Sequence, residues 1–474
     1  MKSFAATMFA LTLTTKLAAA QTIEAYNPVP EVPPTSLAVQ ADGKVLIVGS
    51  FASVGVDVRN GVARLDEDGS VDESFVDPGV NNEVKTIAVQ PDGKLLIGGG
   101  FTSVGGQPRH AMARLEADGT LDGTFADPGF NSNVWAIAVQ PDGRILVAGD
   151  FTEIGTHAQN YFVRLNADGS FDGSFADPEL CCNVARAVAL QADGRIIVGG
   201  FFSQVGGVTH FYLARFSTNG TFDPAFPDTT DNIVPGSIVV APDSSIYIPA
   251  GGDIVYKLDV DGAPVAGFTS AQMDAPIDSI ALQPNGRIVI SGIFENAAGM
   301  PRHALARLNA NGSLDTTFGD LHFSFNAGDE NGYIYGVAAQ PDGRLVVVGN
   351  FSLANGLSRQ YMARVATGDY ATSALVVTPN GAGVNATWYR LGDGPELAQA
   401  PVLMQSSDGV HFTPIGAMTR VANGWSASAS LNVHGAPFYL QALGTVSEGT
   451  TNGSSGQTAS ELYSSDTIFD WGFE

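Results

Sequence analysis

The chain has 474 residues, more than one ordinary hydrophobic core serves, so two or more domains are expected. Hydrophobic residues make up 44% and charged residues only 15%, a composition that excludes a disordered chain. The formal net charge of -25 repels phosphate backbones and argues against a nucleic-acid partner.

The N-terminus is typical of a secretory signal peptide. Lys2 precedes an apolar stretch over residues 4–13, and three alanines at residues 18–20 offer a small-residue cleavage site before Gln21. The apolar stretch is shorter than the about 20 residues of a membrane-spanning helix, and no later segment is long and apolar enough. We therefore expect a secreted or cell-surface protein without a transmembrane segment.

One sequence unit recurs from the mature N-terminus to about residue 367. Its clearest copy has an apolar segment at residues 134–140, a Pro-Asp-Gly turn and a second apolar segment at residues 144–151. A longer loop, a third segment at residues 161–165 and a second Asp-Gly turn follow. The first turn of each unit is marked by Gly43, Gly93, Gly143, Gly194, Ser244, Gly286 and Gly343. The steps of 50, 50, 51, 50, 42 and 57 residues define seven units.

Each unit predicts three β-strands and a short fourth. The segments are rich in Val, Ile, Leu and Phe, and Asp-Gly favours a two-residue hairpin turn because both positions tolerate positive φ. No stretch shows helical periodicity. Four strands in each of seven units of about 50 residues predict an all-β fold with a seven-bladed β-propeller. A linear solenoid is the alternative, although solenoids have shorter repeats and distinct caps.

The two ends of the repeat region suggest how the ring closes. The seventh unit ends at residues 363–365 and lacks the fourth segment that the other units carry. Residues 23–28 of the mature N-terminus are suited to replace it. We expect the two segments to pair, because that pairing buries an otherwise open sheet edge.

Three motifs recur in nearly every unit over residues 22–367. They are Gln-Pro-Asp-Gly-Arg turns, Gly-x-Phe strand ends and Ala-Arg-Leu-x-x-Asp-Gly-x-x-Asp-x-x-Phe segments. In these motifs the chain resembles the delta-sixty repeat β-propeller family. The resemblance implies a secreted or surface-associated bacterial protein whose biochemical role is largely undefined, and it assigns no catalytic residues.

The sequence changes character at about residue 370. Short strands are expected at residues 374–377, 386–389 and 438–441, which predicts a small β-sandwich of fibronectin-like or immunoglobulin-like type. The Gly/Ser/Thr-rich stretch after residue 446 predicts a linker and tail. Residues 468–474 resemble the short Phe-x-x-Gly-Phe-Glu endings of some exported proteobacterial proteins. The expected divisions are residues 1–20 (signal peptide), 21–367 (propeller), 368–446 (β-sandwich) and 447–474 (linker and tail).

The longer loops are expected on one face of the propeller, opposite the tight Asp-Gly turns, and variable loops on a rigid scaffold favour binding. Polar pairs occupy equivalent loop ends, and we expect them to form a ligand-binding rim: Arg59-Asn60, Arg109-His110, Arg302-His303 and Arg359-Gln360. Arginine offers a planar fork to carboxylate or sulfate groups, which makes an acidic polysaccharide the first ligand to test. No metal shared by His110 and His303 is expected, because they belong to well-separated units.

A second set of arginines lies within the third strand of the units: Arg64, Arg114, Arg164, Arg215, Arg307 and Arg364, with Lys257 in the fifth unit. An anion-binding ring is one interpretation. We favour structural charges paired with acids on the next strand, such as Asp72, Asp122 and Asp172.

Two further motifs contain residue types that can ligate metals, but neither has the residue spacing of a known metal site. The acidic run at residues 66–72 resembles a calcium loop but lacks the twelve-residue spacing with a terminal Glu, so we expect a hairpin turn. No cofactor is expected, with calcium kept as the alternative. Cys181 and Cys182 are adjacent, and we expect them to be unpaired or bonded to each other without a catalytic role. A two-thiolate metal site is the alternative.

The sequence carries no nucleophile elbow, phosphate-binding glycine loop or HExxH motif. It favours a non-catalytic extracellular or cell-surface binding or scaffold protein, with a polysaccharide or a cell-surface protein as ligand. A carbohydrate-active hydrolase or lyase with acids from several units is one alternative, and a passive structural surface component is another. Converging acids with a raised carboxyl pKa would favour the enzyme. A face with aromatic residues such as Trp135 and Tyr161 would favour binding.

Overall fold

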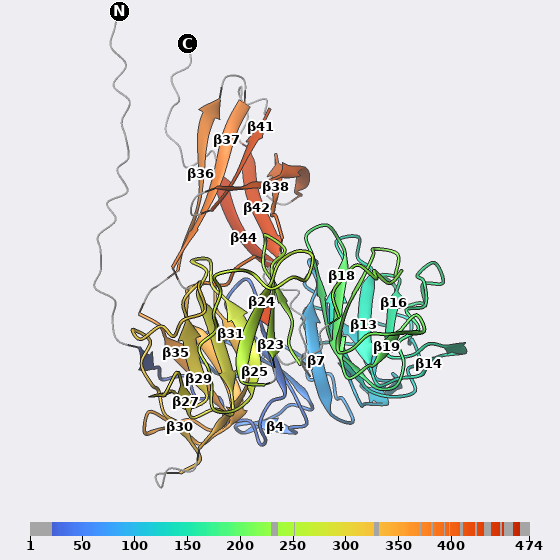
Figure 1. The fold of residues 1–474 in the computed structure, drawn as a ribbon, viewed down its shortest axis with the longest axis horizontal. Coiled ribbons are helices and arrows are strands. Elements are labelled where there is room, and N and C mark those ends of the chain that lie inside the picture. Colours follow the sequence, from blue (N-terminus) through green and yellow to red (C-terminus); the bar gives the residue numbers. More distant parts are fainter. Residues whose placement is uncertain are drawn as a thin grey trace, which may run out of the picture.

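The computed structural model describes residues 21–464 except residues 229–235, 251, 327–330, 369–370, 381–382, 393, 398, 408–410, 422–423, 431–437, 446–447 and 450–457. Every regular element in these residues is a β-strand. Figure 1 shows a ring of sheets with a smaller group of long strands standing on one of its faces. Within the described residues there is no helix with the length and apolarity needed to cross a membrane. The expected signal peptide and the end of the tail lie outside the described residues.

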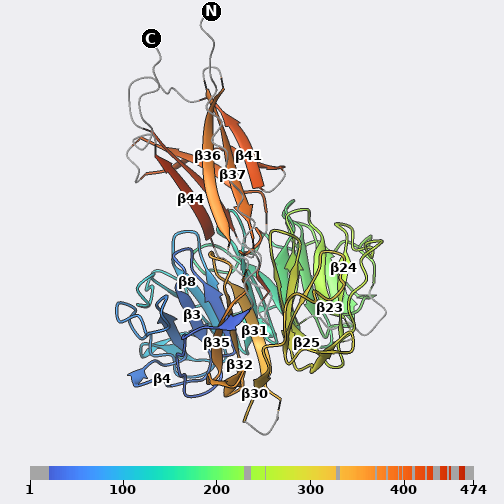
Figure 2. The same ribbon diagram turned by 90° about the vertical axis from the view of Figure 1, so that its left-hand side faces the viewer.

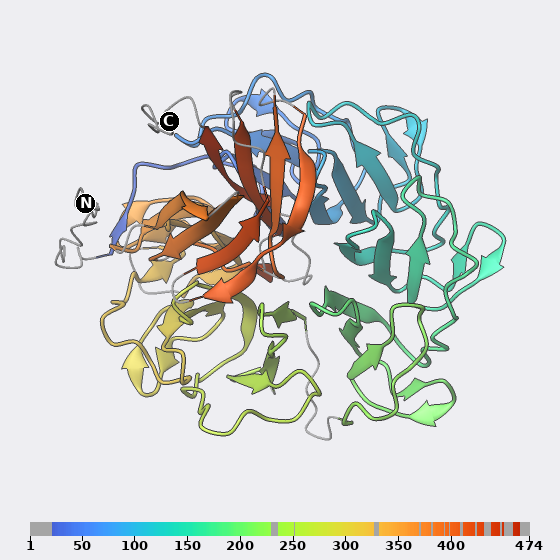
Figure 3. The ribbon, with the colours of Figure 1, turned by 90° about the horizontal axis from the view of Figure 1, so that it is seen from above.

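The ring is a β-propeller whose successive sheets are antiparallel and follow the chain order. Figure 3 shows the sheets arranged around a centre. The innermost strands are β2 (Ser36–Val39), β7 (Val84–Val89), β12 (Val134–Val139), β17 (Ala185–Leu190), β22 (Val239–Val240), β25 (Ile277–Leu282) and β31 (Tyr333–Ala339). The middle strands are β3 (Val45–Val48), β8 (Leu95–Gly99), β13 (Ile145–Gly149), β18 (Ile196–Gly200), β23 (Ile246–Ala250), β26 (Ile288–Gly292) and β32 (Leu345–Asn350).

The third strands are β6 (Val62–Leu65), β11 (Met112–Leu115), β16 (Phe162–Leu165), β21 (Leu213–Phe216), β24 (Ile254–Leu258), β29 (Leu305–Leu308) and β35 (Met362–Ala366). The expected short fourth strand is reduced to single bridges: Leu65 with Val71, Leu115 with Leu121, Leu165 with Phe171, Phe216 with Phe222, Leu258 with Pro264, and Leu308 with Leu314. The middle strands are almost wholly buried, because apolar residues of neighbouring sheets cover both of their faces.

The loop between the middle and third strands contains a small hairpin in several units. These hairpins are β4 (Ser53–Val54) with β5 (Asp57–Val58), β9 (Ser103–Val104) with β10 (Gln107–Pro108), β14 (Glu153–Ile154) with β15 (His157–Ala158), β19 (Gln204–Val205) with β20 (Val208–Thr209), β27 (Asn296–Ala297) with β28 (Met300–Pro301), and β33 (Leu353–Ala354) with β34 (Leu357–Ser358). The last of these hairpins also pairs with β30 (Phe323–Ser324). These hairpins form the loop face that the sequence predicts.

The expected closure by the N-terminus is confirmed. Strand β1 (Thr22–Ile23) pairs antiparallel with β35, with Ile23 opposite Val365. The Glu24 carboxylate accepts a hydrogen bond from Arg364 Nε at 2.6 Å. The Tyr26 ring is completely buried, with the Arg364 guanidinium 4.7 Å from its centroid. Together they occupy the place that an Asp and a Phe take in five of the other units.

The mid-strand arginines are structural, as predicted. In the second unit, Arg114 Nε donates to Asp122 Oδ2 at 2.7 Å, and its Nη1 donates to the Ala167 carbonyl of the next unit at 2.7 Å. The guanidinium also lies over the Phe125 ring, 4.8 Å from the centroid. The same clamp occurs at Arg64 with Asp72 and at Arg164 with Asp172. Each clamp therefore joins one sheet to the next.

These clamps predict acid-sensitive stability. Burial alone would raise the pKa of Asp122, but hydrogen bonds from Lys94, Thr124 and Arg114 outweigh it and hold the pKa well below the usual value. The pKa values of Asp72 and Asp172 are lowered in the same way. A lowered folded-state pKa stabilises the protein above the unfolded pKa of about 4, and that stabilisation is lost as the pH falls further.

We therefore expect the midpoint of thermal unfolding to fall steeply between about pH 4 and pH 2, measured by circular dichroism. Asp122→Asn should lower the free energy of unfolding at pH 7 by about 1–3 kcal/mol and make this pH dependence shallower. An unfolding temperature that stays constant down to pH 2 would contradict the prediction.

The C-terminal unit consists of two four-stranded sheets. One sheet orders β36 (Thr372–Asn380), β37 (Gly383–Leu391), β41 (Gly424–Ala429) and β40 (Thr419–Val421). The other orders β39 (Thr413–Ala417), β38 (Val402–Ser406), β42 (Tyr439–Thr445) and β44 (Thr458–Ser464). Both sheets contribute to one core, in which Trp388 and Trp425 lie with Leu403 and Leu440.

The structure differs from the expected linker after residue 446. Strand β44 pairs with β42 along its length, so residues 458–464 belong to the second sheet. Strand β43 (Glu448–Gly449) pairs with β25 of the ring, opposite Ile280 and Ala281. Composition predicted a linker because Gly, Ser and Thr are abundant there, but backbone pairing does not depend on apolar side chains.

The C-terminal unit stands on the face of the tight Asp-Gly turns (Figure 2). The Glu396 N–H donates to the Leu282 carbonyl at 3.0 Å, where β25 ends. Arg420 pairs with Glu396 and donates to the Pro284 carbonyl at 3.5 Å. The Ala371 N–H donates to the Asp342 carbonyl at 2.9 Å. Among the described residues, these contacts lie at the turn face, opposite the hairpins of the loop face.

Two smaller expectations have clear outcomes. The acidic run at residues 66–72 is a hairpin turn, because the Asp66 N–H donates to the Ser70 carbonyl at 2.8 Å and the Gly69 N–H donates back to Asp66 at 2.9 Å. Cys181 and Cys182 are disulfide-bonded to each other, which is one of the two expected states.

Candidate functional site

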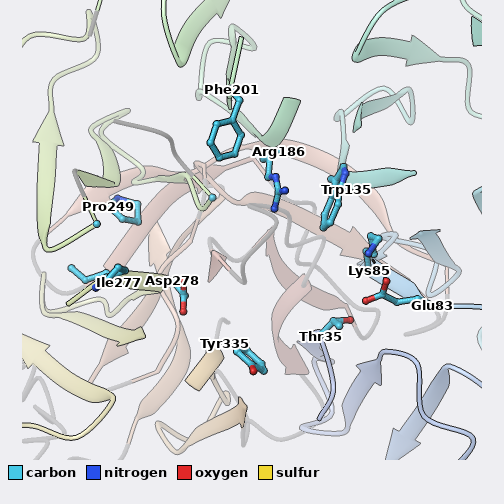
Figure 4. A pocket seen from close by; sticks show the side chains of 13 residues that line it. Thr35, Glu83, Lys85, Trp135, Arg186, Phe201, Pro249, Ile277, Asp278 and Tyr335 are labelled. Atoms are coloured by element: carbon cyan, nitrogen blue, oxygen red, sulfur yellow. Dashed lines mark hydrogen bonds and ion pairs between the residues drawn. The ribbon is translucent and has the colours of Figure 1, made fainter. Parts of the chain in front are cut away.

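A cavity of about 510 Å³ lies at the centre of the loop face, where the innermost strands begin. We call it the central cavity. Figure 4 shows side chains from several sheets pointing into it. The contacts of Glu396 and Arg420 lie where β25 ends, and β43 pairs with β25 at Ile280 and Ala281, so the central cavity, which Asp278 lines, lies toward the start of this strand.

One position of the repeat supplies most of the lining. It lies near the start of each innermost strand: as the second strand residue in Lys85, Trp135, Arg186 and Asp278, as the third in Tyr335, and shortly before the strand in Thr35 and Gly236. All seven residues line the central cavity. We call these the channel positions. In every unit the residue before the channel position is apolar and the residue after it is small, whereas the channel positions differ in size, charge and aromaticity.

A β-bulge explains why these side chains point into the cavity. The register of innermost and middle strands shifts between Val134 and Ala136, so Trp135 is the extra residue of the ladder. The same shift skips Arg186 and Asp278 in their sheets. A bulge re-aims the side chain of the extra residue and often lies next to a functional site.

Two cations flank one indole in the wall of the central cavity. Lys85 Nζ lies 4.2 Å from the Trp135 ring centroid, and Arg186 Cζ lies at the same distance of 4.2 Å. Lys85 also forms an ion pair with Glu83. The guanidinium of Arg186 extends toward Phe201, 5.5 Å from that ring centroid. Three neighbouring sheets thus contribute one Lys-Trp-Arg cluster.

Arg186 is the cation of this cluster that is most available to an anion. Within the described part of the chain, no group forms a hydrogen bond or ion pair with its guanidinium, and its Nε is buried without an acceptor. Burial lowers the pKa of Arg186, and the charge of Asp150 only partly opposes this effect. A partly desolvated guanidinium binds a carboxylate or sulfate more strongly than an exposed one does.

Asp278 and Tyr335 lie across the central cavity from Lys85 (Figure 4). Burial raises the pKa of the Asp278 carboxyl to about 6. Burial also raises the pKa of Tyr335, a hydrogen bond with Asn350 opposes the shift, and the charge of Asp278 adds to it. The central cavity therefore has a cationic side and a side with a carboxyl and a phenol.

The raised pKa of Asp278 predicts a pH-dependent effect of substitution. A carboxyl whose folded pKa is raised destabilises the folded chain increasingly as the pH rises from about 4 to about 6. Asp278→Asn should therefore raise the thermal unfolding midpoint at pH 7 and change it little at pH 4. Differential scanning calorimetry at both pH values measures this, and a lower midpoint for the variant at pH 7 would contradict it.

None of the predicted rim residues lines the central cavity. Arg59, Arg109 and Arg302 each donate from Nη1 to the carbonyl of the preceding residue, at 2.8, 2.8 and 2.6 Å. Arg359 donates from Nε and Nη2 to the Glu24 carbonyl at 3.0 and 2.6 Å. These contacts hold the loop ends in place, and a ligand-binding role for the four arginines stays a prediction.

The neighbours of these arginines clamp the loop to the next segment of the chain. The Asn60 amide donates to Asp77 at 2.6 Å, and His110 Nδ1 lies 2.6 Å from Asp127. His303 Nδ1 lies 2.7 Å from Asp320. Gln360 is half-buried at the same place in its loop. Their role in ligand binding also stays a prediction.

Sequence reasoning missed the channel positions. The signal that could have found them is one position of the repeat that varies in size and charge, between an apolar residue before it and a small residue after it. Trp135 was noted as an aromatic residue, but nothing in the sequence placed it beside Lys85 and Arg186.

Six segments of the chain match the family model described as "Domain of unknown function (DUF5122) beta-propeller". They are residues 40–75, 90–125, 140–175, 191–226, 283–318 and 340–368. These matches agree with the β-propeller fold. No curated protein matches the chain.

Several solved structures are similar to the chain at low identity. YCF48 from Cyanidioschyzon merolae is 10% identical, covers 73% of this chain and 98% of its own, and has a TM-score of 0.46. The gluconolactonase XC5397 from Xanthomonas campestris is 19% identical, with 58% and 97% covered and a TM-score of 0.35. The Cps50 (Swd1) β-propeller domain from Myceliophteria thermophila is 12% identical, with 73% and 99% covered and a TM-score of 0.41.

Proposed function

We propose that this chain is a non-catalytic extracellular or cell-surface protein that binds an acidic saccharide in the central cavity of a seven-bladed β-propeller. The observation that carries the proposal is the set of channel positions. One register position of a repetitive fold gathers different polar and aromatic side chains around one cavity. A structural role alone would be served by the same residue in every unit.

The cationic side of the central cavity supports an anionic ligand. Arg186 has no ion-pair partner among the described residues, while the chain as a whole carries a net charge of -25. Trp135 packs against both cations and so limits their freedom. A carboxylate or sulfate that reaches Arg186 gains charge-assisted hydrogen bonds in a partly water-excluded site.

The opposite side of the central cavity supports a ligand that also carries hydroxyl groups. The Asp278 carboxyl can accept or donate hydrogen bonds near pH 6, and the Tyr335 hydroxyl can do both. A uronic acid or a sulfated sugar combines an anionic group with hydroxyls. A cavity of about 510 Å³ is within the usual range for small-molecule sites and holds one or two sugar units.

A carbohydrate-active enzyme is the second candidate, and one observation favours it. A general acid needs a raised pKa, and Asp278 has one. The other carboxylate of the central cavity is Glu83, which is ion-paired with Lys85. An enzyme would therefore need Glu83 to leave this pair, whereas a binding protein needs no such step.

The finer features of the chain belong to the same proposal. We infer a member of the delta-sixty repeat group that is exported from a bacterium after removal of residues 1–20. The two C-terminal sheets with a shared core support a β-sandwich of fibronectin-like or immunoglobulin-like type. It stands on the turn face and so leaves the central cavity open to a ligand at the cell surface.

A glycan array probed with the mature full-length chain tests the proposed function, with neutral, uronic and sulfated glycans side by side. We expect binding to acidic glycans that weakens with added salt. Product analysis of the bound glycans by mass spectrometry tests the enzyme. Equal binding to neutral glycans or to none would overturn the acidic-saccharide proposal, and cleaved products would favour the enzyme.

A further inference from the structure

One position on the loop face holds glycine in the first two units, Glu179 in the third unit, with a φ of 47°, and His322 in the sixth. The segment after Asp320 places His322 at a backbone position with a φ of 38°. The first and second units have glycine there, Gly79 with a φ of 62° and Gly129 with a φ of 72°. Residues with a Cβ are disfavoured at positive φ, so a histidine at this position raises the conformational free energy of the backbone.

His322 lies beside the clamp of its own unit. The His303 and His322 ring centroids are 4.2 Å apart, and His303 Nδ1 is 2.7 Å from Asp320 Oδ2. The three side chains offer ligand atoms that all lie within 4.8 Å of one another. Each of the three residues is half-buried. None of them lines the central cavity.

The clamp itself does not depend on His322. In the second unit, His110 and Asp127 make the same contact at 2.6 Å, and the third position is Gly129. The backbone N–H of His110 donates to Asp127 at 3.0 Å, as that of His303 donates to Asp320 at 2.9 Å. The sixth unit thus adds His322, a third metal-ligating side chain, to a His–Asp contact that forms without it in the second unit.

We propose that His303, Asp320 and His322 bind a divalent transition-metal ion, with Zn²⁺ as the best match. Two imidazoles and one carboxylate form a typical zinc donor set, whereas calcium and magnesium prefer oxygen ligands alone. Three protein ligands leave one position of a tetrahedral site for water or for a ligand group. Binding joins the end of the β27–β28 hairpin loop to the segment before β30.

The first test removes the added donor. His322→Gly restores the residue of the first two units and relieves the positive φ, so the variant should fold as well as the parent chain. Isothermal titration with Zn²⁺ alone, on full-length chain without a histidine tag, should give one ion per parent chain. The variant should bind at least about 10- to 100-fold more weakly, since loss of an outer-shell partner already costs that much.

The second test builds the site in the first unit. Asn60→His with Gly79→His supplies both imidazoles beside Asp77, and a Cβ at Gly79 meets nothing closer than 3.7 Å. We expect this double variant to bind two Zn²⁺ ions. Asn60→His alone copies the second unit and should still bind one. The metal site is overturned if the parent chain binds no Zn²⁺, or if His322→Gly binds it as tightly as the parent.

Discussion

Replacing Tyr26 by alanine should lower the free energy of unfolding by about 3–5 kcal/mol, the usual cost of truncating a buried aromatic side chain. The Tyr26 ring is fully buried in the core that joins the first and seventh units. A Cβ at Gly69 would lie only 2.8 Å from its Cδ2 atom, which shows how closely the ring packs against the turn. The loss should also weaken the pairing of β1 with β35, which rests on two residue pairs and on the hydrogen bonds of Glu24 with Arg359 and Arg364. Urea unfolding followed by circular dichroism measures it.

Tyr26→Phe is the matched control. The Tyr26 hydroxyl is buried without a hydrogen-bond partner among the described residues. The six other units carry phenylalanine at this place: Phe75, Phe125, Phe175, Phe226, Phe268 and Phe318. Removing an unsatisfied buried hydroxyl should leave the stability unchanged or slightly higher. A Tyr26→Ala variant as stable as the parent would show that the closing segment does not hold the ring together.

Replacing Arg186 by glutamine should weaken binding of an acidic glycan identified on the array by about 30-fold or more, because a partly buried charged partner is worth at least about 2 kcal/mol. The fold should not change, since Arg186 makes no hydrogen bond or ion pair with a described residue. Isothermal titration calorimetry measures the affinity, and circular dichroism checks the fold.

Two control variants separate this site from other surfaces. Arg144→Gln removes the same charge on the turn face, where Arg144 pairs with Asp142, and should bind the glycan like the parent chain. The double variant Arg109→Ala with Arg302→Ala tests the loop-end rim predicted from sequence. Unchanged affinity in Arg186→Gln together with a loss in the double variant would move the site from the central cavity to that rim.

The repeat made much of the fold predictable. Because the unit recurs, its strands and turns can be assigned several times independently. The strands of the degenerate copy around Ser244 can then be assigned by comparison with the other units. The missing fourth segment after residue 365 pointed to the N-terminus, and Glu24 and Tyr26 indeed take the places of the Asp and the Phe. The mid-strand arginines could be assigned because their acids, eight residues later, recur with them.

The candidate sites were less accessible to the same reasoning. The rim arginines attracted attention because they are charged and recur, and recurrence is what a structural clamp produces. The residues at the channel positions do not recur, so each one is a residue that no other unit repeats at the same position. Likewise, His322 can be recognised as a candidate metal ligand only from its distance to His303 in the structure.

The sequence by itself determined the all-β units, their turns, the closing segment and the sheet-to-sheet clamps, because these depend on contacts within a unit or between equivalent positions. Only the tertiary structure decided which side chains meet at the centre of the loop face. Lys85, Trp135 and Arg186 are about 50 residues apart in the chain, and ring closure with a bulge in each of their three strands brings them together. The tertiary structure also decided where the C-terminal unit stands, because pairing of β43 with β25 is a backbone contact that composition does not encode.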